Sequence, residues 1–150
     1  IDWFKTYRHS SWGWGTYKRI WKNINWKHLE NKEISKNENI KISRAGNNIN
    51  QFIKANKKKV INSWATLFNR YCLNKDLLSV SPRFSLINNI GFGLSSTHNK
   101  NILRKKISKT RKKKLLLSKL QPPKLHKNIN NFIRDSNKKN YLLELKLRFL

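Results

Sequence analysis

The residues best suited to chemistry lie near the start of the 150-residue chain, in a segment rich in tryptophan and glycine. Trp12 and Trp14 alternate there with Gly13 and Gly15, and Ser11 precedes them. Glycines beside indoles let the backbone turn closely and expose flat apolar faces, on which the CH faces of sugar rings pack. A neighbouring hydroxyl group can bind the hydroxyls of such a sugar. The pattern favours a saccharide site, and anchoring of a hydrophobic core is the alternative interpretation.

Other arrangements that carry catalysis are scarce. The chain holds seven acidic residues, so the sequence gives little support to a pair of carboxylates acting as general acid and base. Four histidines show neither HxxxH nor HxH spacing, and no local metal motif is present. The single cysteine, Cys72, excludes an internal disulfide. Because Cys72 lies on an apolar helical face, it is predicted to be a buried core thiol.

The charge is strongly positive, with 34 Lys and Arg against 7 Asp and Glu and a formal net charge of +27. Clustered cations release counterions from phosphate, and tryptophans stack on bases, so a basic RNA-associated or other nucleic-acid-associated protein is one interpretation. The competing interpretation is a solvated surface, because Lys, Asn and Ile all have A/T-rich codons. No segment approaches the roughly 18 uninterrupted apolar residues of a membrane span. The sequence therefore predicts a soluble or peripheral protein.

The elements that would position these residues follow from hydrophobic spacing and from turn residues. In the first half of the chain they are a loop over 9–15 with a helix after it, a surface helix or linker over 27–43, and one or two helices over 47–73 that begin at a cap-like Asn47. In the second half they are short strands over 77–82 and 84–90, a loop over 95–99, a solvated basic run over 104–127 and a short amphipathic helix over 129–133.

Four segments follow one another in the order found in one protein family. They are Tyr7 to Lys18 (YRHSSWGWGTYK) with Trp21 and Asn25-Trp26, Arg44 to Asn48 (RAGNN), Ile61 to Ala65 (INSWA), and Asn88 to Gly93 (NNIGFG) with Thr97-His98. These segments resemble the SSWGWATWKDRW, RGGSD, IDSWA and NIGFDGSGTH blocks of bacterial sugar transferases. That family comprises nucleotide-sugar glycosyltransferases related to family 2 and to the N-acetylglucosaminyltransferase I type. The similarity covers about residues 3 to 100, with a looser match from Leu120 to Arg134.

The resemblance implies an α/β fold, namely the C-terminal part of a Rossmann-like glycosyltransferase A-type domain, α-rich with two or three short strands. Residues 1–100 would form the acceptor-side half, 101–127 a basic linker, and 128–150 a C-terminal helix and tail. The chain begins at Ile1 and contains no methionine. We therefore expect a cut end, with the nucleotide-binding half upstream.

The resemblance also implies a site. Its binding residues for a saccharide or glycolipid acceptor are Ser11, Trp12, Gly13, Trp14 and Trp64. Asn48 stands at a position where an acid could act as catalytic base, and His98 would touch a metal or the diphosphate. The donor would be a nucleotide sugar, and a divalent manganese or magnesium ion would offset the charge of its diphosphate. The expected location is the cytoplasm, with the basic run over 104–127 available to hold the protein at the anionic inner face of the membrane.

Three positions depart from the family pattern, because Asn25, Asn48 and Asn62 stand where the family shows aspartate. An amide oxygen is too weakly basic to take a proton from an acceptor hydroxyl at neutral pH. Two interpretations remain open: either Asn48 is not the base position, or the chain is a non-catalytic remnant.

Overall fold

The computed structural model describes residues 3–83, 85–87 and 122–137. Its elements are, in chain order, β1 (Trp3–Thr6), α1 (Lys18–Lys22), α2 (Trp26–Asn31), α3 (Lys36–Ser43), α4 (Ile49–Lys57), α5 (Trp64–Asn74), β2 (Ser79–Pro82), β3 (Lys124–Leu125) and α6 (Lys127–Ser136). The described part is thus a small α/β structure that is mostly helical.

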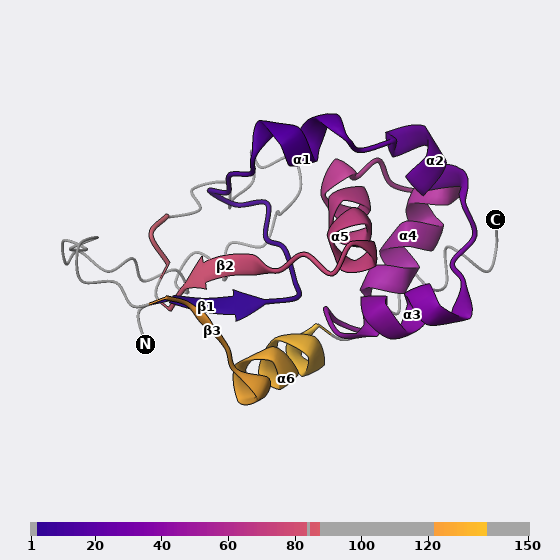
Figure 1. The fold of residues 1–150 in the computed structure, drawn as a ribbon. Helices are drawn as coiled ribbons and strands as arrows, with labels where there is room; N and C mark the ends of the chain where they lie inside the picture. Colours follow the sequence, from indigo (N-terminus) through magenta and orange to yellow (C-terminus); the bar gives the residue numbers. More distant parts are fainter. Residues whose placement is uncertain (1–2, 84, 88–121, 138–150) are drawn as a thin grey trace, which may run out of the picture.

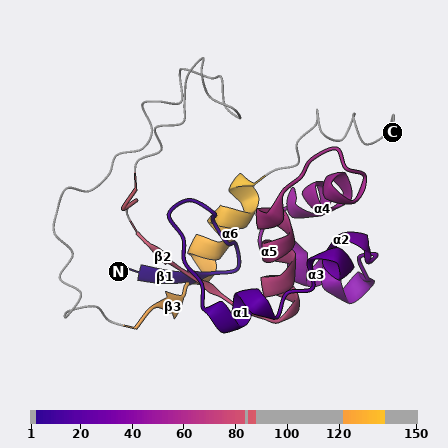
Figure 2. The same cartoon turned by 90° about the horizontal axis from the view of Figure 1, so that it is seen from above.

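The three strands form one mixed sheet in the order β2-β1-β3, with β1 in the centre. Strand β2 runs antiparallel to β1 and places Ser81 opposite Phe4. Strand β3 runs parallel to β1 and places Lys124 opposite the same Phe4. In both views the sheet lies between α1 and α6, while α2 to α5 form a helical layer at one end of it (Figures 1 and 2).

Short polar residues start three of the helices by capping exposed backbone N–H groups. The Asn25 side chain accepts a hydrogen bond from the His28 backbone at the start of α2. Ser35 accepts one from the Glu38 N–H and so begins α3. Ser63 accepts one from the Thr66 N–H and so begins α5. These local caps set where the chain leaves each loop.

The core consists of two hydrophobic clusters that share α5. One cluster contains Ile24, Leu29, Leu67, Phe68 and Cys72. The other contains Ile42, Ala45, Ile49, Ile53 and Leu73. Helix α5 contacts α2, α3 and α4, so it is the central element of the helical layer (Figure 1). Cys72 is buried as predicted, and burial raises the pKa of its thiol to about 11.

A buried ion pair crosses this helical layer. Arg70 of α5 is fully buried, and its Nε lies 2.6 Å from Oε1 of Glu38 in α3, while its Nη2 lies 3.2 Å from Oε2. The guanidinium also donates to the backbone carbonyls of Leu29 and Glu33. Burial alone would raise the pKa of Glu38, but hydrogen bonds from Arg70 and Asn74 and the Arg70 charge outweigh burial and lower it. The Glu38 carboxylate therefore stays ionised at neutral pH.

Three buried asparagines hold loops and strands by pairing their amide groups with the backbone. Asn69 of α5 accepts from the His9 N–H at 2.9 Å and donates to the His9 carbonyl at 3.1 Å. Asn56 likewise accepts from the Ser63 N–H at 2.8 Å and donates to the Ser63 carbonyl at 3.1 Å. Asn130 of α6 accepts from the Tyr7 N–H and donates to the Lys5 carbonyl. The loop that follows β1 is thereby fixed to α5 and α6.

Most expected elements are present, with shifted ends. The loop over 9–15 is confirmed, and the helix after it is the short α1. The stretch over 47–73 holds two helices, and the first begins at Ile49 rather than after Asn47. Residues 27–43, expected as one surface helix or a linker, contain most of α2 and all of α3. Strand β2 and helix α6 confirm the elements predicted over 77–82 and 129–133.

Two expectations need correction or lie beyond the described residues. The basic linker was expected to extend to residue 127. Lys124 and Leu125 are exposed, as expected of a solvated run, yet they form β3 on the unpaired edge of β1, and α6 begins at Lys127. Residues 85–87 form no strand. The rest of the strand expected over 84–90, the loop over 95–99 and residues 104–121 lie outside the described residues. Within the described part, no helix is long and apolar enough to cross a membrane.

The buried pair gives the first testable prediction. Replacing Arg70 by Met leaves the Glu38 carboxylate buried without its cation, and we expect the free energy of unfolding to fall by about 3–5 kcal/mol. Adding Glu38→Leu to Arg70→Met should recover part of that loss, because the uncompensated charge is then gone. Urea denaturation at pH 7 measures both effects.

An exposed ion pair provides the control. Lys59 lies 2.5 Å from Glu30 with its side chain largely in solvent, and Lys59→Met should change the free energy of unfolding by less than about 1 kcal/mol. A loss in Arg70→Met no larger than that of Lys59→Met would contradict the structural role given to Arg70.

Candidate functional site

Three indole rings gather at one end of α5. Trp14 comes from the loop before α1, Trp21 from α1, and Trp64 is the first residue of α5. The ring centroids of Trp14 and Trp64 lie 5.0 Å apart, those of Trp14 and Trp21 5.7 Å, and those of Trp21 and Trp64 5.8 Å. Trp21 is 38% exposed and Trp64 41% exposed. The three residues, named here the indole surface, present apolar ring area to solvent.

Buried rings support the indole surface from below. Phe68 of α5 lies 5.3 Å from Trp14 and 5.9 Å from Trp21 between ring centroids. His9 meets both Trp14 and Phe68 edge to face, at 5.0 and 4.6 Å. Burial lowers the pKa of His9 to about 4, so its ring is neutral at pH 7. Trp26 meets Trp21 edge to face, with 4.8 Å between the ring centroids. Trp14 thus anchors the core and supports the indole surface at once.

The turn before Trp14 depends on one glycine. Gly13 has a φ of +57°, and a Cβ atom there would lie 2.6 Å from Cγ2 of Ile87. Any other residue would meet both a strained backbone and a steric clash. Trp12, beside it, is 60% exposed, and no ring contact joins it to the indole surface among the described residues. Ser11 is half-buried. The structure therefore brings Trp14 and Trp64 together and leaves Trp12 projecting into solvent.

Asn48 lies in a second cluster, beneath Arg8. Nη1 of Arg8 donates to Oδ1 of Asn48 and to the Ala45 carbonyl, both at 3.0 Å. Gly46 lets the guanidinium approach, because its φ is +133° and a Cβ there would lie 2.9 Å from Nη1 of Arg8. Burial lowers the pKa of Arg8, and both of these acceptors are neutral. Asn48 is the N-cap residue of α4, but its side chain makes no capping hydrogen bond. Its Oδ1 accepts a hydrogen bond from Arg8 instead.

The other residues singled out in the sequence occupy separate places. Asn25 caps α2, and Asn62 is exposed just before the Ser63 cap of α5. His98 lies outside the described residues. Within residues 3–83, 85–87 and 122–137, no group of three or more His, Cys, Asp or Glu side chains is placed to hold a metal ion. The described residues thus supply no donor set for the expected divalent cation.

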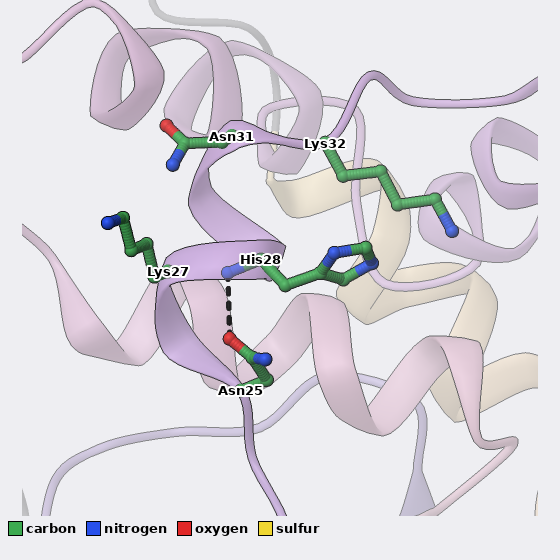
Figure 3. A pocket seen from close by; sticks show the side chains of 5 residues that line it. All are labelled: Asn25, Lys27, His28, Asn31 and Lys32. Atoms are coloured by element: carbon green, nitrogen blue, oxygen red, sulfur yellow. Dashed lines mark hydrogen bonds between the residues drawn. The ribbon is translucent and has the colours of Figure 1, made fainter.

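A polar hollow of about 510 Å³ adjoins this region. Its lining residues all come from α2, its cap and the residue that follows it: Asn25, Lys27, His28, Asn31 and Lys32. Figure 3 shows that His28 and Lys32 extend to one side of the helix, whereas Lys27 and Asn31 extend to the other. The cationic groups therefore do not converge on one point. One lining residue, Asn25, directly precedes Trp26, and Trp26 contacts Trp21 of the indole surface.

Comparison with protein-family models, with curated proteins and with solved structures finds no significant match.

Sequence reasoning missed two members of this region as site residues. Trp21 was not named as a site residue, although it belongs to the first resembling segment, and no helical spacing links it to Trp14, which lies in the loop before α1. Phe68 follows Trp64 by four residues, which is one turn of the predicted helix, and this spacing could have placed it beneath Trp64. Arg8 gave no signal, because its partner Asn48 lies 40 residues away.

Asn48 gives the second prediction. Replacing it by Asp would place a carboxylate against the half-buried Arg8, and hydrogen bonds between charged groups are stronger than neutral ones. We expect Asn48→Asp to raise the free energy of unfolding at pH 7 by about 1 kcal/mol or more. The gain should disappear as the pH falls through the lowered pKa of the new carboxylate in the folded state, below its unfolded value of about 3.9.

Asn47→Asp is the matched control, since Asn47 is exposed one residue earlier. Denaturation curves at pH 7 and pH 3 compare the two variants. Equal effects of the two substitutions at pH 7 would show that Arg8 does not select the residue at position 48.

Proposed function

We propose that this chain is the acceptor-side part of a nucleotide-sugar glycosyltransferase, which moves a sugar from a nucleotide donor to a saccharide or glycolipid acceptor. The proposal rests on the sequence resemblance and on one observation about the fold. The first of the resembling segments, Tyr7 to Lys18, contacts the second and the third. Segments that share a functional site are expected to meet in this way, although they lie far apart in the sequence.

Arg8 of the first segment donates hydrogen bonds to Ala45 and Asn48 of the second segment. Trp14 stacks on Trp64 of the third. Gly13 packs against Ile87, the residue directly before the fourth segment. One short loop therefore contacts two of the regions that carry the resemblance, and the fourth region lies outside the described residues.

In this proposal the indole surface is the acceptor platform. The half-exposed faces of Trp21 and Trp64 would pack on the CH faces of a sugar ring, and Phe68 and His9 keep the indoles in place from below. Because tryptophan rings have few rotatable bonds, little conformational entropy is lost when a sugar binds. Trp12 and Ser11 would contact the acceptor beyond this platform.

Asn48 is assigned a positioning role in place of the catalytic one. Its Oδ1 accepts a hydrogen bond from Arg8, and an amide takes no proton at neutral pH. The aspartate of the family pattern at this position would form an ion pair with Arg8. The proposal therefore seeks the catalytic base elsewhere.

The remaining parts of the proposal concern groups outside the described residues. The fold would be completed to a Rossmann-like A-type domain by a nucleotide-binding half. A manganese or magnesium ion bound mainly by that half, with His98 near it, would offset the charge of the leaving diphosphate. Transfer would take place in the cytoplasm, at the inner face of the membrane where the acceptor is a glycolipid.

The third prediction tests the platform. We expect neutral disaccharides such as cellobiose to bind weakly to the chain and to shift the indole N–H signals of Trp21 and Trp64 in NMR spectra. Trp21→Ala and Trp64→Ala should each weaken binding by about tenfold, because each removes roughly half of the apolar contact area, and tenfold corresponds to about 1.4 kcal/mol.

Phe132→Ala is the matched control, since Phe132 is a 73% exposed aromatic residue on α6, across the sheet from α1 (Figure 1). Its binding should equal that of the parent chain. If no disaccharide moves the indole signals, or if Phe132→Ala weakens binding as much as Trp64→Ala, the platform is wrong.

A further inference from the structure

The indole surface is bordered by positive charge. Helix α1 consists of Lys18, Arg19, Ile20, Trp21 and Lys22, so three cations share one short helix with an indole of the surface. Over residues 3–29, which include α1 and the loop before it, the sequence holds six Lys and Arg and no acidic residue. The electrostatic potential at this end of the molecule is therefore positive over the same region that exposes aromatic rings.

One of these cations is held in a defined position. The guanidinium carbon of Arg19 lies 4.7 Å from the centre of the Tyr17 ring, in a cation–π contact. Tyr17 is the N-cap residue of α1, so this contact holds Arg19 at the start of the helix that carries Trp21. The stacking restricts the long Arg19 side chain before any ligand arrives. Its planar group of N–H donors remains suited to two parallel hydrogen bonds with a carboxylate or phosphate.

Several cations elsewhere in the described structure are neutralised by acidic partners, whereas the three cations of α1 are not. Lys57 pairs with Glu33, Lys59 with Glu30, and Lys41 with Asp76. Among the described residues, no carboxylate lies within ion-pair distance of Lys18, Arg19 or Lys22. A cluster of unneutralised cations beside apolar rings fits a ligand that carries a negative charge on a sugar.

We propose that the saccharide bound at the indole surface is anionic, with its carboxylate or phosphate group on Arg19 and with Lys18 and Lys22 adding to the attraction. This proposal rests on the proposed function and specifies the class of acceptor. The sugar ring would lie on Trp21 and Trp64, and the acidic group would point toward α1. Neutral sugars would use the rings alone and bind more weakly.

The experiment compares ligands that differ only in charge. Cellobiose and cellobiouronic acid share the same backbone, and the second carries a carboxylate; glucose and glucose 6-phosphate form the corresponding phosphate pair. Binding to the chain is followed by tryptophan fluorescence at low salt, where exposed charges are least screened. We expect each anionic sugar to bind about tenfold more tightly than its neutral partner, and the pair with the larger ratio identifies the preferred acidic group.

Two variants locate the charge effect. Arg19→Gln should bring the ratio close to one for both pairs and leave the binding of cellobiose unchanged. Lys75→Gln removes the same charge at the opposite end of α5 from Trp64 and should leave the ratio as it is. A ratio near one in the parent chain, or equal losses in the two variants, would overturn the proposal while leaving cellobiose binding, and so the proposed function, intact.

Two further outcomes have separate meanings. Failure of every sugar to bind would contradict the proposed function as well. A single-stranded RNA oligomer that displaces cellobiouronic acid and binds more tightly, with the same loss in Arg19→Gln, would overturn the proposal in favour of a nucleic-acid surface.

Discussion

The buried ion pair between Arg70 and Glu38 is the interaction on which the rest of the structure depends. A fully buried guanidinium costs several kcal/mol to remove from water unless its N–H groups are all placed on acceptors. The carboxylate of Glu38 and the carbonyls of Leu29 and Glu33 provide those acceptors. They belong to α2, α3 and the connection between them, so these elements must sit at fixed positions around α5.

The candidate site depends on the same helix, through residues close to Arg70. Trp64 begins α5 and forms part of the indole surface, and Phe68 supports that surface one turn later. Asn69 then forms two hydrogen bonds with the backbone of His9, which fix the loop that carries Trp14. Because Arg70 follows Asn69 directly, the residues that stabilise the helical layer and those that shape the aromatic surface share one rigid element. A change in the position of α5 would therefore shift both the helical layer and the indole surface.

The sequence predicts the elements that depend on neighbouring residues, and it does not predict contacts between residues far apart in the chain. The two helices over 47–73 and the amphipathic helix near 129–133 follow from local periodicity, as does the burial of Cys72. The glycine turn before Trp14 is also local, since Gly13 adopts a positive φ. By contrast, the pairing of β3 with β1 joins residues about 120 positions apart, and a two-residue strand in a basic run has no hydrophobic pattern of its own. The same reason hides the contact between Arg8 and Asn48.

The site shows the same division. Trp14 and Trp64 are both identified by the resemblance, but only the folded structure brings them to 5.0 Å and adds Trp21 between the loop and α5. The hydrogen bond that the Asn48 amide oxygen accepts from the half-buried Arg8 was likewise not predictable, because the two residues lie 40 positions apart. Fold elements built from local pattern were therefore predictable, whereas polar partners chosen across the structure were not.

The most direct test of the account is an assay of sugar transfer by the full gene product, including any coding sequence that precedes Ile1. The protein is incubated with a panel of nucleotide sugars, manganese or magnesium, and saccharide acceptors, and the products are followed by mass spectrometry. The account predicts transfer that needs a nucleotide sugar, with Trp64→Ala lowering transfer to the acceptor more than hydrolysis of the donor. Absence of both transfer and donor hydrolysis across the panel, in a protein that is folded, would contradict it.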